Sequence, residues 1–367
     1  MIKAPDHVLK VKAYVPGKPM EELERELGIK DPVKLASNEN PLGPSPLAME
    51  AVLSETKKGS LNRYPDGSGF YLKKKLSRTL GVGTQWLTLG NGSNELIDIA
   101  ARTFLRPGDE AVMAVPSFVV YSMSATLQGA TPVEIPLTGD LRHDLQHMAQ
   151  AATPKTRMIF IANPNNPTGT INYRPEYDKF FSEIPDDVLV VIDEAYVEYV
   201  THKDYPDSMK YLAQGKNVLI LRTFSKIYGL AGLRTGYGIS HPEILAQMER
   251  VRPPFNANSL GQAAAIRALD DAAHVRRSIE MNGQGKEFLY RELSALGYDH
   301  TPTEANFIYI RVTDAKTLFD ALLKEGVIIR PAGRDAIRVT IGLPEENKRF
   351  IHALKKTAAA LKRSGPK

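Results

Sequence analysis

The segment Val188-Leu-Val-Val-Ile-Asp-Glu194 gives the clearest indication of the fold. Its five consecutive apolar residues predict a strand buried on both faces, because a strand with one face in water would alternate apolar and polar side chains. Strands buried in this way belong to parallel sheets that helices cover on both sides. Two acidic residues follow the run at once, so charged side chains are expected where this strand ends.

The same pattern extends on both sides of this strand, from about residue 85 to residue 240. Short apolar runs alternate there with helical patterns, which predicts an α/β fold with a mostly parallel sheet. The other predicted strands are 86–89, 111–115, 132–135, 158–162 and 218–221. Most of these runs end in polar, glycine-rich or proline-rich residues. Since ligands of open α/β sheets bind beyond the carboxyl ends of the strands, a site is expected there.

After residue 241 the pattern becomes helical, and it then gives way to a compact segment with strand candidates at 307–312, 326–329 and 337–341. This segment predicts a smaller α+β domain, on which the first 35 residues would pack. We therefore predict a large domain of residues 36–255 and a small domain built from both termini, residues 1–35 plus 256–367.

The composition of the 367 residues is that of a soluble globular protein, with 43% hydrophobic and 24% charged residues. No apolar run approaches the roughly 18–20 residues of a membrane helix. The absence of cysteine excludes disulfides and thiolate metal sites and suits a cytoplasmic protein. The formal charge of +5 forms no basic stripe interleaved with aromatic residues. We expect neither nucleic acid nor membrane as a partner, and the charge is compatible with small anionic substrates.

Four predicted strand ends carry the groups that pyridoxal 5′-phosphate would require. Lys226 follows Thr223-Phe-Ser, and its amine could condense with the aldehyde. Asp193 could keep the pyridine nitrogen protonated. Gly90-Asn-Gly-Ser-Asn-Glu95 precedes a predicted helix (96–104), whose N-terminus could bind the phosphate together with Arg234. The fourth strand end is Asn163-Pro-Asn-Asn-Pro-Thr-Gly169.

In this order, these motifs resemble those of the fold-type-I pyridoxal-phosphate aminotransferases. Leu35-Ala-Ser-Asn-Glu-Asn-Pro-Leu-Gly43, Arg63-Tyr-Pro-Asp-Gly67 and Ile337-Arg-Val-Thr-Ile-Gly342 narrow the resemblance to the histidinol-phosphate aminotransferase family. The similarity runs from about Tyr14 to Arg349. It implies a large αβα domain around a mostly parallel sheet and a smaller α+β domain. It also implies transamination of L-histidinol phosphate with 2-oxoglutarate, in histidine biosynthesis.

The resemblance also implies a role for each matching residue. Lys226 would be the Schiff-base lysine and proton-transfer base, with Asp193 and Tyr196 as its catalytic partners. Asn166 and Tyr196 would bond the phenolic oxygen of the ring, and Phe118 would stack on it. The phosphate would be held by Ser93, Asn94, Thr223, Ser225 and Arg234. Tyr64 would reach the cofactor phosphate of a neighbouring subunit, which implies a homodimer. The substrate would be bound by Tyr14, Asn38, Asn166, Arg338 and Arg349.

Other interpretations of these residues stay open. An aromatic amino-acid aminotransferase could have the same scaffold, since imidazole and phenyl rings occupy similar space. The glycine loop at 90–95 nearly matches a dinucleotide fingerprint and would suit an NAD-dependent dehydrogenase, although Glu95 replaces the third glycine. His143 and His147 have a zinc-like spacing without a third ligand, so we predict no metal.

Several single residues also have a purely structural alternative. Tyr64 and Phe118 could be core aromatics, and Arg349 could be a charge on a helix surface. The segment from Gly326 to Arg338 is short, and either Arg330 or Arg334 within it could join the substrate site.

Overall fold

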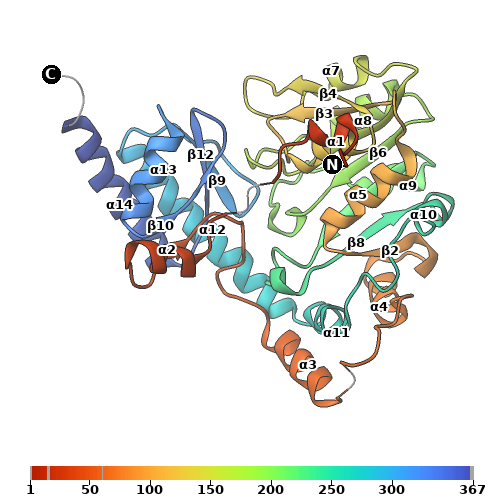
Figure 1. Ribbon diagram of the computed structural model, residues 1–367, viewed down its shortest axis with the longest axis horizontal. Helices are drawn as coiled ribbons and strands as arrows, with labels where there is room; N and C mark the ends of the chain where they lie inside the picture. The colour runs from red at the N-terminus through yellow and green to blue at the C-terminus, as the bar shows by residue number, and fades with distance from the viewer. Residues whose placement is uncertain (1, 15–16, 60, 364–367) are drawn as a thin grey trace.

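The computed structural model describes residues 2–14, 17–59 and 61–363. Its largest element is a seven-stranded sheet, drawn at the right of Figure 1. All neighbouring strands are parallel except β8, which runs antiparallel to the strands on either side of it. The mostly parallel sheet predicted from the sequence is thus confirmed. The strands follow the order β2 (Leu87–Asn91), β8 (Thr235–Ser240), β7 (Val218–Thr223), β6 (Leu189–Asp193), β5 (Thr156–Ala162), β3 (Glu110–Val115) and β4 (Thr131–Pro136).

Strand β6 shows why the sheet is covered on both sides. All five of its residues are buried. Val190 and Ile192 belong to one hydrophobic cluster and Leu189 and Val191 to another, because successive side chains point to opposite faces. Helices α5 (Ser93–Phe104), α6 (Val120–Leu127) and α10 (Pro242–Met248) contribute to the second cluster. The first cluster receives side chains from α3 (Pro46–Lys57), α4 (Phe70–Leu80), α7 (Leu145–Gln150), α8 (Arg174–Glu183), α9 (Ser208–Ala213) and α11 (Ser259–Ala268).

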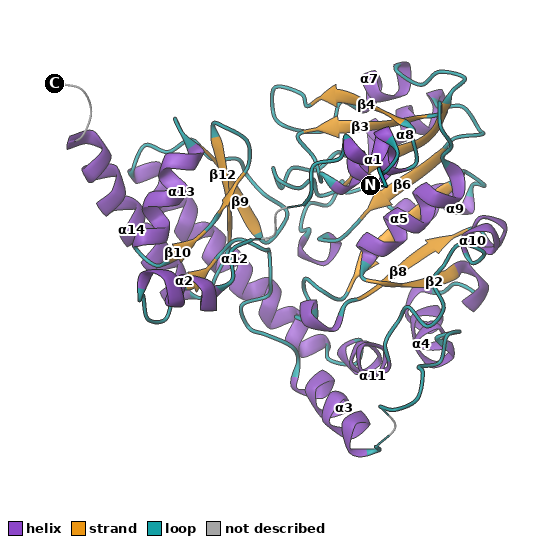
Figure 2. Cartoon of the chain, in the orientation of Figure 1, coloured by secondary structure: helices purple, strands orange, loops and turns teal. Residues whose placement is uncertain are grey.

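The elements of a second, smaller sheet lie at the left of Figures 1 and 2, and a separate hydrophobic cluster is formed here. The smaller sheet is antiparallel, in the order β11 (Arg330–Pro331), β12 (Ala336–Thr340), β9 (Phe307–Arg311). The cluster takes side chains from β9, β12, α12 (Ala272–Ala295), α13 (Ala315–Lys324) and α14 (Pro344–Arg363). Strand β1 (Val33–Lys34) pairs in parallel with β10 (Val327–Ile328). Helix α2 (Met20–Leu27) packs Leu23 near Ile328.

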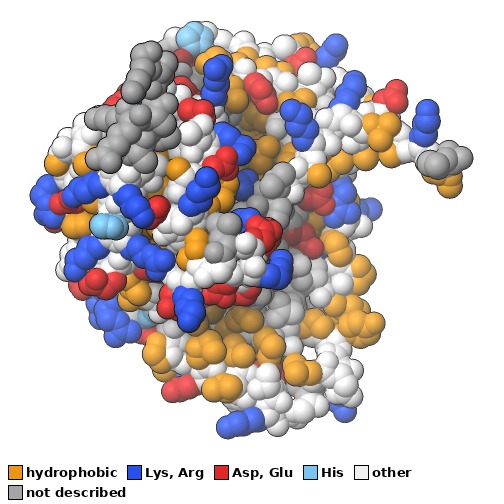
Figure 3. Space-filling view, turned by 60° about the vertical axis from the view of Figure 1, so that its left-hand side comes forward, with side chains coloured by type: hydrophobic (Ala, Val, Ile, Leu, Met, Phe, Trp, Pro, Cys, Tyr) orange, Lys and Arg blue, Asp and Glu red, His pale blue; other side chains and the backbone are white. Residues whose placement is uncertain are grey.

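Two helices from the ends of the predicted small domain contact the larger body instead. Helix α1 (Asp6–Leu9) contacts α6, and α11 packs on α3 and α4. In the described part of the chain, no helix is long and apolar enough to cross a membrane. Two basic residues of α14 form ion pairs, Lys355 with Glu292 and Lys356 with Glu325. Positive and negative side chains are interspersed on the face shown in Figure 3.

Candidate active site

A cavity of about 780 Å³ lies beyond the carboxyl ends of β5, β6 and β7. The loops after these strands line one side of it, as the sequence predicted. The other side comes from the distant segment 36–38 and from β11 and β12 of the smaller sheet. The cavity therefore collects residues that lie more than 300 positions apart in the chain, such as Tyr14 and Arg338.

Lys226 lies three residues beyond the end of β7 and lines this cavity. Its Nζ donates to the carbonyl oxygen of Ser37 at 3.0 Å and lies 5.7 Å from the centre of the Tyr196 ring. The pKa of Lys226 is lowered to about 8, mainly by burial and then by the charge of the Arg338 guanidinium. Near that pH a large fraction of this amine is neutral, so it can act as a nucleophile or a base.

Asp193 ends β6 and is 7% exposed. Its Oδ2 accepts from the Tyr121 hydroxyl at 2.8 Å, and its Oδ1 accepts from the Ala195 N–H at 3.2 Å. Burial raises the pKa of Asp193, whereas these hydrogen bonds and the charge of Lys226 oppose the rise. The buried carboxylate is thus held in place and faces a cavity that could receive a cationic ring nitrogen.

The N-terminus of α5 provides an anion-binding cup. The helix begins at Ser93, and its first N–H groups have no partner within the helix. Gly92, before the helix, has a φ of +79°, a backbone conformation that favours glycine, and a side chain there would come within 2.7 Å of Arg234 Nη2, so the guanidinium would have to move. Ser225 and Thr223 lie on the same wall, where the Ser225 N–H donates to Thr223 Oγ1 at 3.1 Å.

Aromatic and amide groups surround the space between this cup and Asp193. The Tyr196 hydroxyl accepts from Asn38 Nδ2 at 2.9 Å, and burial raises the pKa of Tyr196 to about 12. Phe118 lines the cavity and packs edge-on to Tyr121, with 5.6 Å between ring centres. Asn166 also lines it.

Arg338 lies on the opposite wall, on β12. Its Nη1 donates to Asn166 Oδ1 and its Nη2 to the carbonyl oxygen of Ala36, both at 2.6 Å. Its Nε is buried without a hydrogen-bond partner. No carboxylate of the described residues forms a salt bridge with this guanidinium, and burial lowers its pKa. A partly buried guanidinium whose Nε lacks a partner is suited to an anionic ligand.

A second arginine adjoins Arg338. Arg330 is its direct partner across the β11–β12 pair, so both side chains lie on the same face of the sheet, and both line the cavity. Tyr14 lies beneath Arg330, 5.6 Å from guanidinium carbon to ring centre. Arg334 is exposed and is not one of the residues that line the cavity.

Comparisons with known proteins agree with this geometry. Residues 30–354 match the family model described as aminotransferase class I and II. The chain belongs to this family. It is 50% identical over 363 residues to the histidinol-phosphate aminotransferase of Moorella thermoacetica, covering 97% of this chain and 93% of that one. It is 48% identical to histidinol-phosphate aminotransferase 2 of Pseudomonas aeruginosa, covering 96% of both chains.

A solved structure supports the same assignment to the aminotransferases. The crystal structure of histidinol-phosphate aminotransferase from Sinorhizobium meliloti in complex with pyridoxal-5′-phosphate superposes with a TM-score of 0.90. The identity is 26%, and the alignment covers 98% of this chain and 99% of that one. The groups around the present cavity fit that cofactor: an anion cup at α5, a buried carboxylate, an aromatic wall and a lysine.

Membership of the aminotransferases excludes the NAD-dependent dehydrogenase. The glycine loop does join a strand to a helix, but β2 is an edge strand that pairs antiparallel with β8. A dinucleotide site would need it to start a parallel β–α–β unit.

Two predicted site residues lie outside the cavity of this chain: Arg349, expected to bind substrate, and Tyr64, expected to reach the cofactor phosphate of a neighbouring subunit. Tyr64 is 81% exposed and stacks on Phe255 with 4.5 Å between ring centres, away from the cavity-lining residues. Arg349 donates to the carbonyl oxygen of Asp31 and does not line the cavity. His143 is buried and His147 bonds Asp144, and no group of three metal-ligating side chains occurs in the described ranges.

Sequence reasoning missed Tyr121 and the carbonyl oxygens of Ala36 and Ser37. Tyr121 lies on a helix with no motif around it, and its role follows only from its contact with Asp193. The carbonyl oxygens belong to a recognised motif at residues 35–43, but backbone acceptors have no sequence signal. In contrast, Lys226, Asp193 and Arg234 were predicted from the ends of the strands and their motifs, and the role of Asn166 from the family resemblance.

Proposed function

We propose that this chain is a pyridoxal-phosphate-dependent histidinol-phosphate aminotransferase. It would exchange the amino group between L-histidinol phosphate and 2-oxoglutarate, giving imidazole acetol phosphate and L-glutamate in histidine biosynthesis. Relatives that carry this name are 45–50% identical to it over more than nine-tenths of the chain. The observation that carries the proposal is that a low-pKa lysine and a partly buried arginine without an anionic partner line the same cavity.

The residues around the cavity would divide the binding of the cofactor among them. Bound pyridoxal phosphate supplies an electron sink that stabilises negative charge on the substrate carbon next to the amine. Asp193 would pair with its ring nitrogen, Asn166 and Tyr196 would hydrogen-bond its phenolic oxygen, and Phe118 would stack on the ring. Lys226 would attach to it covalently. The phosphate would be held by Ser93, Asn94, Thr223, Ser225 and Arg234.

Lys226 would also move the proton. Its pKa of about 8 lets the amine accept a proton near neutral pH and return it to a neighbouring atom. The Ser37 carbonyl, which accepts from Nζ at 3.0 Å, would orient the amine between these steps. Tyr196, under the amine, would exclude water from one side of it.

Arg338 and Arg330 would bind the anionic group of each substrate. Like charges directly opposite each other across two strands repel, and the charge of Arg330 contributes to the lowered pKa of Arg338. A phosphate or carboxylate between them would relieve that repulsion. Both proposed substrates carry such a group. Tyr14 and Asn38 would complete this set, whereas the position of Arg349 gives no support for its inclusion.

We further propose a cytoplasmic homodimer in which Tyr64 reaches the neighbouring subunit's cofactor phosphate. Tyr64, Tyr71, Phe70 and Phe255 are 81%, 72%, 54% and 45% exposed. Exposed aromatic side chains of this size are typical of an interaction surface. Sedimentation of the purified protein and of Tyr64→Ala would test the assembly and the contribution of this tyrosine.

The division into domains 36–255 and 1–35 plus 256–367 is likewise proposed. Separate hydrophobic clusters support two domains, whereas the contacts of α1 and α11 favour assigning these helices to the larger one. Limited proteolysis followed by mass spectrometry would locate the boundary.

A substrate panel tests the function. The purified protein with pyridoxal phosphate should show a visible absorbance band. Borohydride should abolish this band, and reduction with labelled borohydride should leave the label on Lys226. With 2-oxoglutarate as acceptor, turnover of histidinol phosphate should exceed that of phenylalanine and tyrosine. Faster turnover of the aromatic amino acids would identify an aromatic aminotransferase instead, and absence of the band would refute the cofactor.

A further inference from the structure

Asn165 is the centre of a hydrogen-bond network behind the wall of the cavity. Its neighbours Pro164 and Asn166 line the cavity, but Asn165 does not, and it is 1% exposed. Every polar position of its side-chain amide is used. Oδ1 accepts from Ser117 Oγ at 2.9 Å and lies 3.0 Å from His143 Nε2; Nδ2 donates to the Pro116 carbonyl at 3.2 Å and to Thr168 Oγ1 at 2.9 Å.

These contacts fix the hydrogen on His143. The Pro116 carbonyl can only accept, so the amide atom facing it is Nδ2 and the atom facing His143 is Oδ1. His143 must therefore donate from Nε2. Burial lowers the pKa of His143 to about 4, so the ring is neutral at physiological pH and its one N–H goes to Asn165. Nδ1 is left buried without a partner.

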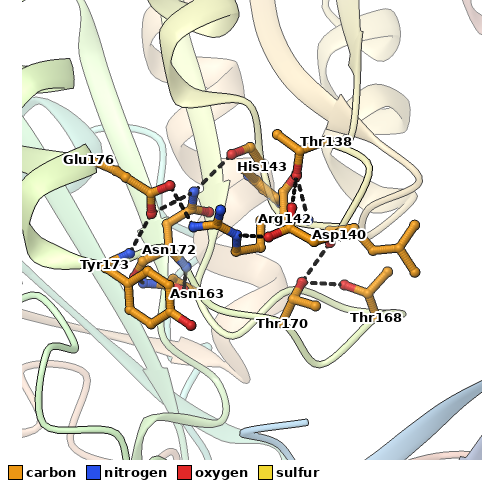
Figure 4. Close-up of polar contacts among 11 residues, drawn as sticks. Thr138, Asp140, Arg142, His143, Asn163, Thr168, Thr170, Asn172, Tyr173 and Glu176 are labelled. Carbon is orange, nitrogen blue, oxygen red and sulfur yellow. Dashed lines mark hydrogen bonds and ion pairs between the residues drawn. The ribbon is translucent and has the colours of Figure 1, made fainter. Parts of the chain in front are cut away.

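The backbone around His143 is held in place by a second layer of contacts, shown in Figure 4. Asn172 Nδ2 donates to the His143 carbonyl at 2.8 Å, and Asn172 N donates to Asn163 Oδ1 at 3.0 Å at the end of β5. Arg142 bridges Asp140 and Glu176, with 2.6 Å to each carboxylate. The imidazole is thus presented to Asn165 from a fixed segment.

Asn165 connects this segment to two residues of the cavity wall. Asn166, its chain neighbour, accepts from Arg338 Nη1. Ser117, its hydrogen-bond partner, precedes Phe118, which packs on Tyr121. The Asn165 amide therefore links the loop after β3 to the loop after β5, so a shift of this amide would displace both Phe118 and Asn166.

We propose that Asn165, oriented by the Nε2–H of His143, is a positioning residue that sets Asn166 for its contact with the phenolic oxygen of the cofactor and Phe118 for its contact with the ring face. This inference rests on the proposed function. Neither Asn165 nor His143 lines the cavity, so they act through their neighbours. Small displacements of a positioned group lower turnover strongly, so the network belongs to the catalytic geometry as well as to the fold.

Two variants at His143 distinguish a role in positioning the cavity residues from a role in stability alone. In His143→Gln the side-chain amide can place an N–H close to the position of Nε2, whereas His143→Phe keeps a ring and loses the donor. Asn165→Asp is a further variant, because a carboxylate lacks the donors that face Pro116 and Thr168. His147→Gln is the matched control, since His147 is exposed and lies on the same segment. Ile184→Ala, in the hydrophobic core, controls for lost stability alone.

Each holoenzyme would be measured for kcat and KM, for the pH midpoint of its visible absorbance band, and for its melting temperature. The Kd of pyridoxal phosphate would be measured by titrating the cofactor-free protein. His143→Phe and Asn165→Asp should lower kcat about tenfold or more, raise the cofactor Kd and shift the band midpoint, because hydrogen bonding at the phenolic oxygen sets that midpoint. His143→Gln and His147→Gln should stay within about twofold of the wild type. Ile184→Ala should lower the melting temperature without moving the midpoint.

Three results would overturn the inference: an unchanged band and kcat in His143→Phe, equal losses in His143→Gln and His143→Phe, or losses in His143→Phe that Ile184→Ala reproduces. If Asn165→Asp does not fold, the two His143 variants still decide. A wild-type protein without any visible band would instead refute the proposed function, and with it this inference. If the wild-type protein shows the band and the His143 variants keep its kcat, cofactor Kd and band midpoint, the positioning role alone is refuted.

Discussion

The two walls of the cavity are built in different ways. The wall proposed for the cofactor comes from consecutive loops of one sheet, in which β5, β6 and β7 deliver Asn166, Asp193 and Lys226 to the same edge. The wall proposed for the substrate combines Tyr14, the segment 36–38 and the β11–β12 pair, which meet only in the folded chain. The first wall would hold the cofactor, which is the same for every substrate. Residues of the anion site on the second wall could be exchanged without disturbing the large sheet. Variants on each wall should therefore have different kinetic signatures.

The largest effect is expected on the cofactor wall. Lys226→Ala should lower kcat roughly a thousandfold, because it removes the amine that carries both the covalent attachment and the proton. It should retain the fold. Steady-state kinetics measure kcat, and borohydride labelling measures the covalent attachment. Lys203→Ala is the control, because Lys203 is exposed. Activity within tenfold of the wild type would show that another group transfers the proton.

A smaller and different effect is expected on the substrate wall. Arg338→Gln should raise KM for histidinol phosphate and for 2-oxoglutarate roughly tenfold to a hundredfold, since a charge-assisted bidentate contact is lost. The cofactor Kd should change little. Arg338→Lys should recover only part of the loss, because an ammonium cannot replace the planar fork. A fall in cofactor affinity with unchanged KM would place Arg338 on the other wall.

The two walls are coupled through charge, and this coupling can be measured in the cofactor-free protein. The amine of Lys226 should become reactive toward an acylating reagent as the pH rises through about 8. Arg338→Gln removes a positive charge that lowers this pKa, so the midpoint should move to higher pH and the reactivity at pH 8 should fall. Peptide mass spectrometry would report Lys226 separately, with Lys203 as the internal reference. An unmoved midpoint would mean that Arg338 does not contribute, and that burial and the charge of Arg234 lower the pKa.

The smallest effect is expected at Arg349. Because it donates to the Asp31 carbonyl and does not line the cavity, Arg349→Gln should leave kcat/KM within about twofold and cost about 1 kcal/mol of stability or less. Kinetics and thermal unfolding measure both quantities. A large rise in KM would return Arg349 to the substrate wall, as the sequence resemblance implied.

The contrast between the walls also explains what the sequence could predict. Asp193 follows its apolar run directly and Lys226 comes three residues after the end of β7. Since parallel strands end at one edge of the sheet, sequence order was enough to bring them together. Helix α5 starts at Ser93, three residues earlier than its apolar pattern indicated. Its N-cap is Gly92, which carries no capping side chain and so no sequence signal.

The substrate wall was harder to predict, because its residues depend on contacts between distant elements. Arg338 was found because a charged residue inside an apolar strand needs a partner. Arg330 and Arg334 could not be separated until the pairing of β11 with β12 placed Arg330 opposite Arg338. Arg349 resembles a site residue in sequence, but its position on α14 turns it toward Asp31.

The cross-strand pair of Arg330 and Arg338 has a consequence for handling the protein. Folding brings two like charges together, so the ligand-free form is less stable than it would be with an anion between them. Any anion that binds only the folded chain shifts the unfolding equilibrium in proportion to its concentration relative to its Kd. The choice of buffer then becomes a variable: phosphate should raise the melting temperature and compete with substrate, whereas a zwitterionic buffer should do neither.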